Sequence, residues 1–168
     1  MDGAYETWRD AAQNSFFGDG LYYAADIAGS DIERHPEAFT NQPGRHYPEC
    51  FYQNGTYTGS YNLLSYLKEG GVYDKGFAVV GKANSIITAM EAASNFDDIV
   101  TNATEPSPLS QMYGEAVAMR ATAYRELIKY WGDVPFSDTF GEVAMGITSR
   151  DSIYDKIIAD LVKVEPLM

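Results

Sequence analysis

The sequence predicts an all-α fold, and two observations carry this prediction. Apolar residues recur every three or four positions in several segments, which is the spacing of one face of a helix. Glycines and prolines stand between these segments, where helices end and turns begin. The clearest repeat lies within residues 109–131 and consists of Tyr113, Ala116, Arg120, Tyr124, Leu127 and Trp131. The chain is therefore predicted to be a set of helices joined by loops.

The first third of the chain is predicted to hold one helix and a long loop region. The repeat in residues 3–17 predicts the helix, which stops at Gly18 because glycine tolerates the left-handed backbone at a helix end. No period persists from Leu21 to Thr56, although a short helix around Tyr22 to Ala28 shortens the loop. Long loops within a compact domain are usually functional, so function is sought there first.

Two helices are predicted between this loop region and residue 95. Tyr61, Leu64 and Leu67 predict a short helix that ends at Gly70-Gly71. A longer helix is predicted to begin near Asp74. Its apolar face consists of Phe77, Val80, Ala83, Ile87 and Met90. The Gly-Gly connection fits an antiparallel pair.

The last two helices are predicted to form a second pair. Gly132 ends the helix over residues 109–131, and Thr148 precedes Asp151 by three positions, as at the start of a capped helix. The facing stripes are predicted to consist of Tyr124, Leu127, Ile128, Ile153, Ile157 and Leu161. Such helix pairs are stacked in tetratricopeptide solenoids, although the connection from Gly132 to Ile147 is longer than in a regular repeat.

A single pair of this kind leaves an apolar face without its neighbour. We therefore expect residues 1–168 to form one helical domain that is truncated at its C-terminus. If so, an apolar face near Leu161, Val164 and Leu167 is exposed or covered by a neighbouring chain.

Charge and composition exclude several classes of function. The chain has 24 acidic and 12 basic residues and a formal net charge of −12, which repels nucleic acid and anionic lipid headgroups. Cys50 is the single cysteine, so no intrachain disulfide forms. The sequence contains neither a signal peptide nor a long uncharged apolar run. An export signal or lipid-bearing cysteine is thus not present in this chain.

The segment from Gly114 to Phe136 reads GEAVAMRATAYRELIKYWGDVPF and resembles the GEAxxxRAxAYxxLxxxxGDVP signature of the SusD/RagB family. Residues 81–87 are similar to that family's "raN.ii" helix, and residues 149–161 to its "R.svYd.Ii.DL" helix. The order of these three segments and the spacing between them agree with those of the family. The resemblance covers residues 60–165, whereas residues 1–59 match in general character.

The resemblance implies a lipoprotein on the extracellular face of the outer membrane of Bacteroidetes, attached through a lipid anchor that this chain lacks. Such proteins sit on a SusC-like TonB-dependent transporter and bind oligosaccharides, or peptides in RagB-like members, without catalysis or cofactor. The signature residues have structural roles: Arg120 reaches from the apolar stripe to a carboxylate, and Gly132 with Pro135 fixes an exit turn.

An aromatic segment in the loop region supplies the candidate ligand-binding residues. Rings and amides alternate there, which suits sugar recognition by stacking and hydroxyl hydrogen bonds. The candidates are Phe51, Tyr52, Asn54 and Tyr57. In the alternative reading, these rings only pack the loop onto the helices. A second alternative is a structural module that docks on the transporter while a missing C-terminal part holds the ligand.

Metal and catalytic sites are not predicted. His35, His46 and Cys50 lack a fourth partner at zinc-ligand spacing, so surface positions are the simpler explanation. The acidic run with Asp26, Asp31 and Glu33 could supply oxygens to calcium, but it lacks the acid spacing and the glycine of a calcium-binding loop. An α-helical glycosidase is the third alternative, and it needs two carboxylates at catalytic separation in one pocket.

Overall fold

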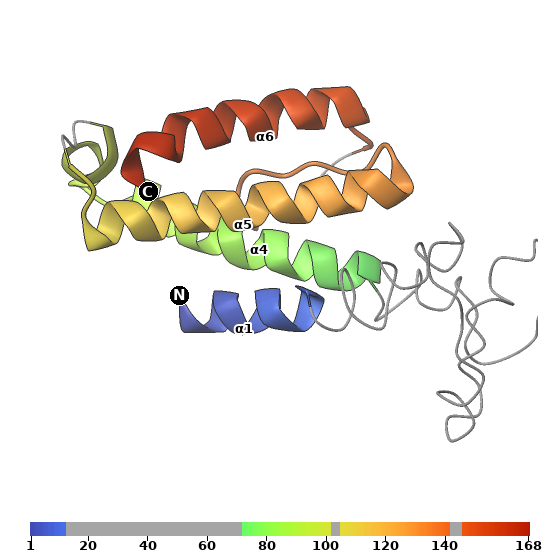
Figure 1. Cartoon of the computed structure of the whole chain (residues 1–168), viewed down its shortest axis with the longest axis horizontal. Coiled ribbons are helices and arrows are strands. Elements are labelled where there is room, and N and C mark those ends of the chain that lie inside the picture. The colour runs from blue at the N-terminus through green and yellow to red at the C-terminus, as the bar shows by residue number, and fades with distance from the viewer. Residues whose placement is uncertain (13–71, 102–104, 142–145) are drawn as a thin grey trace, which may run out of the picture. The chain divides into compact units, whose positions relative to one another are not determined.

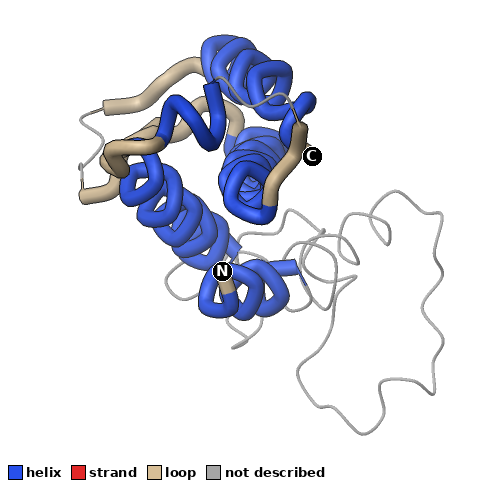
Figure 2. The backbone as a smooth tube through the Cα atoms, turned by 90° about the vertical axis from the view of Figure 1, so that its left-hand side faces the viewer, coloured by secondary structure: helices blue, strands red, loops and turns tan. Residues whose placement is uncertain are grey.

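The computed structural model describes residues 1–12, 72–101, 105–141 and 146–168. Contacts divide the chain into two compact units, one of Met1–Trp8 with Gly76–Met168 and one of Arg9–Lys75. The described residues are helices joined by loops, and their only β pairing is an isolated bridge between Val134 and Thr148 (Figure 2). The all-α class is thus confirmed for this part of the chain. The single domain over residues 1–168 and the tetratricopeptide-like stacking stay predictions.

The helices lie close to the predicted positions (Figure 1). They are α1 (Asp2–Ala11), α4 (Val72–Glu91), the π-helical turn η3 (Asp97–Thr101), α5 (Pro108–Trp131), α6 (Arg150–Val164) and the 3-10 turn η4 (Glu165–Leu167). The helix predicted over residues 3–17 corresponds to α1, and its second half lies outside the described residues, as do the helices predicted around residues 22–28 and 61–67.

In the larger unit, α5 and α6 form an antiparallel pair (Figure 1). The beginning of α5 lies beside the end of α6, because Gly114 approaches Val164 and Met168. Five of the six residues predicted to face each other are at most 4% exposed: Tyr124, Leu127, Ile128, Ile153 and Ile157. The sixth, Leu161, is 37% exposed, so that part of the prediction was wrong.

The buried face of α6 explains the position of Leu161. The residues that face α5 are Ile153, Ile157, Asp160 and Val164, which follow one another at steps of four, three and four. Asp160 takes the inward position because its carboxylate pairs with Arg120 of α5. Since successive helical residues are rotated by about 100°, Leu161 falls at the edge of this stripe.

The expected apolar face at the end of the chain is only partly present. Val164 and Leu167 are 1% and 5% exposed, because they complete a core with Ile87, Tyr113 and Val117. The turn η4 carries Leu167 into this core. The exposed apolar residues of this region are instead Ile158, Leu161, Val162 and Met168.

Local caps fix where the two long helices begin. Ser107 caps α5, and its hydroxyl accepts a hydrogen bond from the backbone N–H of Ser110. Ser149 caps α6 by accepting from the N–H of Ser152. The cap predicted at Thr148 with Asp151 was therefore displaced by one residue. Thr148 is engaged elsewhere, because its N–H donates to the carbonyl of Val134 at 3.0 Å.

The smaller unit is described only at residues 9–12 and 72–75. Lys75 Nζ lies 3.1 Å from a carboxylate oxygen of Asp10. Both side chains are partly exposed, so this ion pair contributes little to stability.

Candidate functional site

The sequence-predicted ligand residues Phe51, Tyr52, Asn54 and Tyr57 lie outside the described residues, as do the histidines, Cys50 and the acidic run considered as metal ligands. The described part of the chain instead contains a buried polar junction, which is built from the segments that carry the family resemblance.

Arg120 forms the centre of this junction, and its side chain is almost fully buried. One guanidinium nitrogen, Nη1, donates to Asn84 Oδ1 of α4 and to the backbone carbonyl of Asp138, both at 3.0 Å. The other, Nη2, donates to Asp160 Oδ2 of α6 at 2.8 Å. Arg120 thus joins α4, α5, α6 and the segment that follows α5.

Two of the partners of Arg120 come from the other two segments of the resemblance. Asn84 is the asparagine of the segment over residues 81–87, Arg120 is the arginine of the signature, and Asp160 is the aspartate of the segment over residues 149–161. The expectation that Arg120 reaches a carboxylate is confirmed. Sequence reasoning did not identify Asn84 or Asp160 as partners, because their contacts span 36 and 40 positions.

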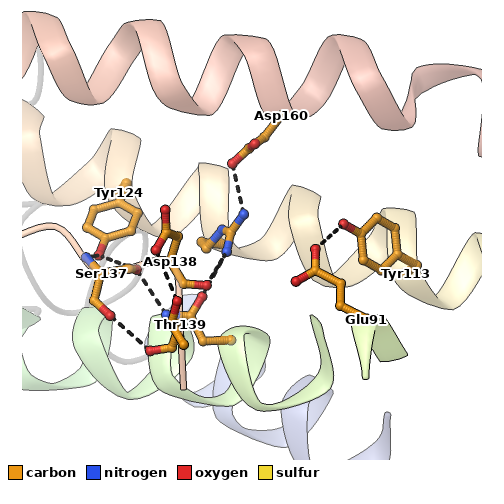
Figure 3. A network of polar contacts seen from close by, with 9 residues as sticks. Glu91, Tyr113, Tyr124, Ser137, Asp138, Thr139 and Asp160 are labelled. Atoms are coloured by element: carbon orange, nitrogen blue, oxygen red, sulfur yellow. Dashed lines mark hydrogen bonds and ion pairs between the residues drawn. The ribbon is translucent and has the colours of Figure 1, made fainter. Parts of the chain in front are cut away.

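Tyr124, one helical turn after Arg120, holds the segment that follows α5. Its hydroxyl accepts from the N–H of Ser137 at 2.8 Å and donates to the carbonyl of the same residue at 3.1 Å (Figure 3). Asn84 Nδ2 donates to that carbonyl as well, at 2.9 Å. The ring of Tyr124 stacks on Phe136 at a centroid distance of 4.7 Å. The segment after α5 is therefore fixed by side chains of both α4 and α5.

This geometry makes the junction a structural element. A buried guanidinium is tolerated when a carboxylate and hydrogen-bond acceptors compensate its charge, and all three described partners do so. Asp160 is about one-third exposed, whereas Arg120 is almost fully buried, so solvent reaches the pair mainly at the carboxylate. The junction therefore holds the helices together and offers no free cationic group to a ligand.

Other signature residues also have structural explanations. A Cβ at Gly114 would lie 3.0 Å from Met168 Cγ, so glycine permits the close approach of α5 to the end of the chain. Glu115 accepts a hydrogen bond of 2.6 Å from the hydroxyl of Tyr5 in α1. Gly132 ends α5 with a φ of +72°, a conformation that favours glycine, and its N–H donates to Ile128. Sequence reasoning predicted this helix end correctly.

A tyrosine–carboxylate pair lies at the other end of the same helices. The hydroxyl of Tyr113 donates to Glu91 Oε1 at 2.8 Å (Figure 3). Burial raises the pKa of Tyr113 well above its usual value, and the hydrogen bond to Glu91 raises it further. The phenol is therefore neutral and acts as a hydrogen-bond donor that ties α5 to α4.

Glu126 is a buried carboxylate that the apolar pattern of α5 did not indicate. Its Oε1 accepts from Arg125 Nε at 2.9 Å and from Arg125 Nη2 at 2.5 Å, while Lys129 Nζ lies 3.8 Å from Oε2. Oε2 and the hydroxyl of Tyr130 are buried, and neither has a hydrogen-bond partner within the described part of the chain. The two cations compensate the charge of the carboxylate, so burial of Glu126 does not by itself indicate a reactive group.

The described residues contain no group of three or more histidines, cysteines or carboxylates arranged to hold a metal ion. A shallow hollow on α6 is lined by Leu161, Val162, Glu165 and Met168, and Glu165 is its single carboxylate. Glycoside hydrolysis of the usual kind needs two such groups. Among the helices that are described, none is long and apolar enough to cross a membrane.

Comparisons of the chain with models of protein families, with curated proteins and with solved structures give no match.

Proposed function

We propose that this chain is the N-terminal helical part of a SusD/RagB-like nutrient-binding protein. It captures oligosaccharides or peptides at the bacterial cell surface and delivers them to a SusC-like TonB-dependent transporter, without catalysis. The observation that supports this proposal most directly is the convergence of three separate resembling segments on Arg120.

The convergence supports the resemblance because each of the three segments resembles the family on its own residues, and the three are far apart in the sequence. A chance similarity of short helical segments would depend on apolar spacing, which many helices share. It would not bring the distinctive polar residue of each segment into a single network. Asn84, Arg120 and Asp160 form such a network, and their hydrogen bonds are between 2.8 and 3.0 Å long.

The proposed ligand contacts lie in the aromatic segment from Tyr47 to Tyr61 rather than at the junction. Phe51, Tyr52 and Tyr57 offer ring faces, and Asn54 offers an amide that both donates and accepts hydrogen bonds. The net charge of −12 disfavours anionic ligands, so neutral oligosaccharides are the better substrates for a first screen.

Calorimetry with a panel of neutral oligosaccharides and short peptides tests the proposal, with chromatography of the same mixtures after incubation. We expect saturable binding of at least one ligand and no product. Product formation would favour the glycosidase alternative. Binding of a SusC-like barrel without any ligand would favour a docking module.

The ligand residues are tested with Tyr52→Ala and Tyr57→Ala. Each loss of a stacked ring is expected to weaken binding up to about tenfold, while the melting temperature stays unchanged. An unchanged affinity with a lowered melting temperature would show that these rings pack the loop instead.

A further inference from the structure

The segment Phe136–Gly141 contains two phenylalanines in opposite environments. Phe136 stacks on Tyr124, and Lys156 Nζ lies 4.9 Å from the centre of its ring. Phe140 is 59% exposed, although it follows Phe136 by only four residues. The exposed ring is therefore not needed to pack this segment.

The backbone that carries Phe140 is held on both the α4 and the α5 side. Ser137 is bonded to Asn84 and Tyr124, and the carbonyl of Asp138 accepts from Arg120. The N–H of Phe140 itself donates to Thr88 Oγ1 of α4 at 3.2 Å. Isolated exposed rings are common on protein surfaces. This ring differs in that bonds from buried side chains fix its loop in advance.

Two polar residues, Asp138 and Thr139, precede the exposed ring in the sequence. Asp138 is exposed, and its Oδ1 accepts a hydrogen bond from the hydroxyl of Thr139 at 3.2 Å (Figure 3). Its second carboxylate oxygen makes no hydrogen bond with the described residues. Phe140 and Asp138 are thus two exposed residues separated by one position in the same segment. Such a pair offers a sugar two kinds of contact, because the C–H face of a sugar stacks on an aromatic ring and a sugar hydroxyl donates to a carboxylate oxygen.

We propose that Phe140, together with Asp138, forms an additional contact site for a neutral oligosaccharide. This inference rests on the proposed function and adds a site outside the aromatic segment of residues 47–61. A protein partner is disfavoured because charged residues are depleted at the centre of protein interfaces. An anionic glycan is disfavoured by Asp138 and by the net charge of −12. Because the loop is already held in place, binding needs to order less of the chain and so loses less conformational entropy.

Calorimetry on the full chain with maltohexaose, xylohexaose and mannohexaose tests the site. Phe140→Ala is expected to weaken binding of the bound oligosaccharide about two- to tenfold. Asp138→Asn is expected to weaken it less, because the amide still accepts a hydrogen bond. The control is Ile147→Ala, which removes a 73% exposed apolar side chain elsewhere in the same connection and should leave affinity unchanged. The melting temperature of all three variants should equal that of the wild type.

The outcomes separate this site from the proposed function. If the wild type binds and Phe140→Ala binds equally well, the site is overturned while the proposed function stands. An equal loss in Phe140→Ala and Ile147→Ala also overturns the site, because the effect is then not specific to the ring. If the wild type binds none of the three sugars, the inference fails, and the peptide arm of the earlier screen decides the proposed function.

Discussion

The two faces of α6 have similar apolar side chains and opposite environments. The inner face carries Ile153 and Ile157, which are 0% and 4% exposed, whereas the outer face carries Ile158 and Val162, which are 55% and 63% exposed. The inner face also carries Asp160, a charged residue that would look misplaced in an apolar stripe. Thus hydrophobicity alone does not tell which face of this helix packs against α5.

The partner across the interface decides between the two faces. Asp160 is directed to α5 because Arg120 is buried there, and the register of that contact places Ile153, Ile157 and Val164 inward as well. A buried charge without its partner is costly, so a helix rotation that exposed Asp160 would be opposed by Arg120. The polar pair therefore specifies the orientation of an interface that apolar burial stabilises.

The largest effect is expected from Arg120→Ala. This change removes three hydrogen bonds and leaves Asn84 and Asp160 without their partner. Breaking a buried ion pair from one side costs about 3–5 kcal/mol, so the free energy of unfolding should fall by that order, as measured by urea denaturation.

Arg150→Ala is the control for the loss of an arginine. Its side chain is 58% exposed and pairs with Asp151, which is 88% exposed, so the free energy of unfolding should change by less than about 0.5 kcal/mol. Equal effects of the two substitutions would contradict the structural role of the junction.

Ile157→Ala and Ile158→Ala compare the two faces at neighbouring positions with the same side chain. Ile157→Ala opens a cavity between α6 and α5 and should lower the free energy of unfolding by about 2–5 kcal/mol. Ile158→Ala removes a mostly exposed side chain and should change it by less than about 0.5 kcal/mol. The same urea titration measures both. A larger loss for Ile158→Ala would mean that the outer face is the packed one.

Tyr124→Phe tests how strongly the segment after α5 is held. The change keeps the ring on Phe136 and removes only the hydroxyl, which leaves the N–H of Ser137 unpaired. We expect a loss of about 1–3 kcal/mol in the free energy of unfolding. The partly exposed Tyr154 provides the control, and Tyr154→Phe should have an effect of less than about 0.5 kcal/mol. Equal losses in the free energy of unfolding for the two variants would show that the hydroxyl of Tyr124 does not hold this segment.

Helix positions followed from the sequence because they depend on local spacing and end signals. The repeat in residues 109–131 and the stop at Gly132 both match α5. The junction around Arg120 could not be predicted from the sequence, because apolar spacing does not indicate which distant polar residue a buried arginine contacts. Arg120 was expected to reach a carboxylate, yet Asp160 lies 40 positions away. The exposure of Phe140 beside the packed Phe136 likewise depends on tertiary contacts.

The beginning of α6 gives the smallest expected effect and compares two neighbouring hydroxyl residues. The sequence pattern favours Thr148 as the cap, whereas the structure places Ser149 there, with its hydroxyl accepting from the N–H of Ser152 at 3.3 Å. A cap of this kind contributes about 1 kcal/mol, because it satisfies one of the N–H groups that a helix leaves unpaired at its start.

Ser149→Ala should therefore lower the free energy of unfolding by about 1 kcal/mol. Thr148→Ala should have a smaller effect, since its backbone bond to Val134 is retained in the variant. The carboxylate of Asp133, which accepts from the N–H of Arg150 at 2.8 Å, supports the same helix end in both variants and keeps the comparison matched. A larger loss for Thr148→Ala would place the cap where the sequence pattern predicts it and would contradict the observed start of α6.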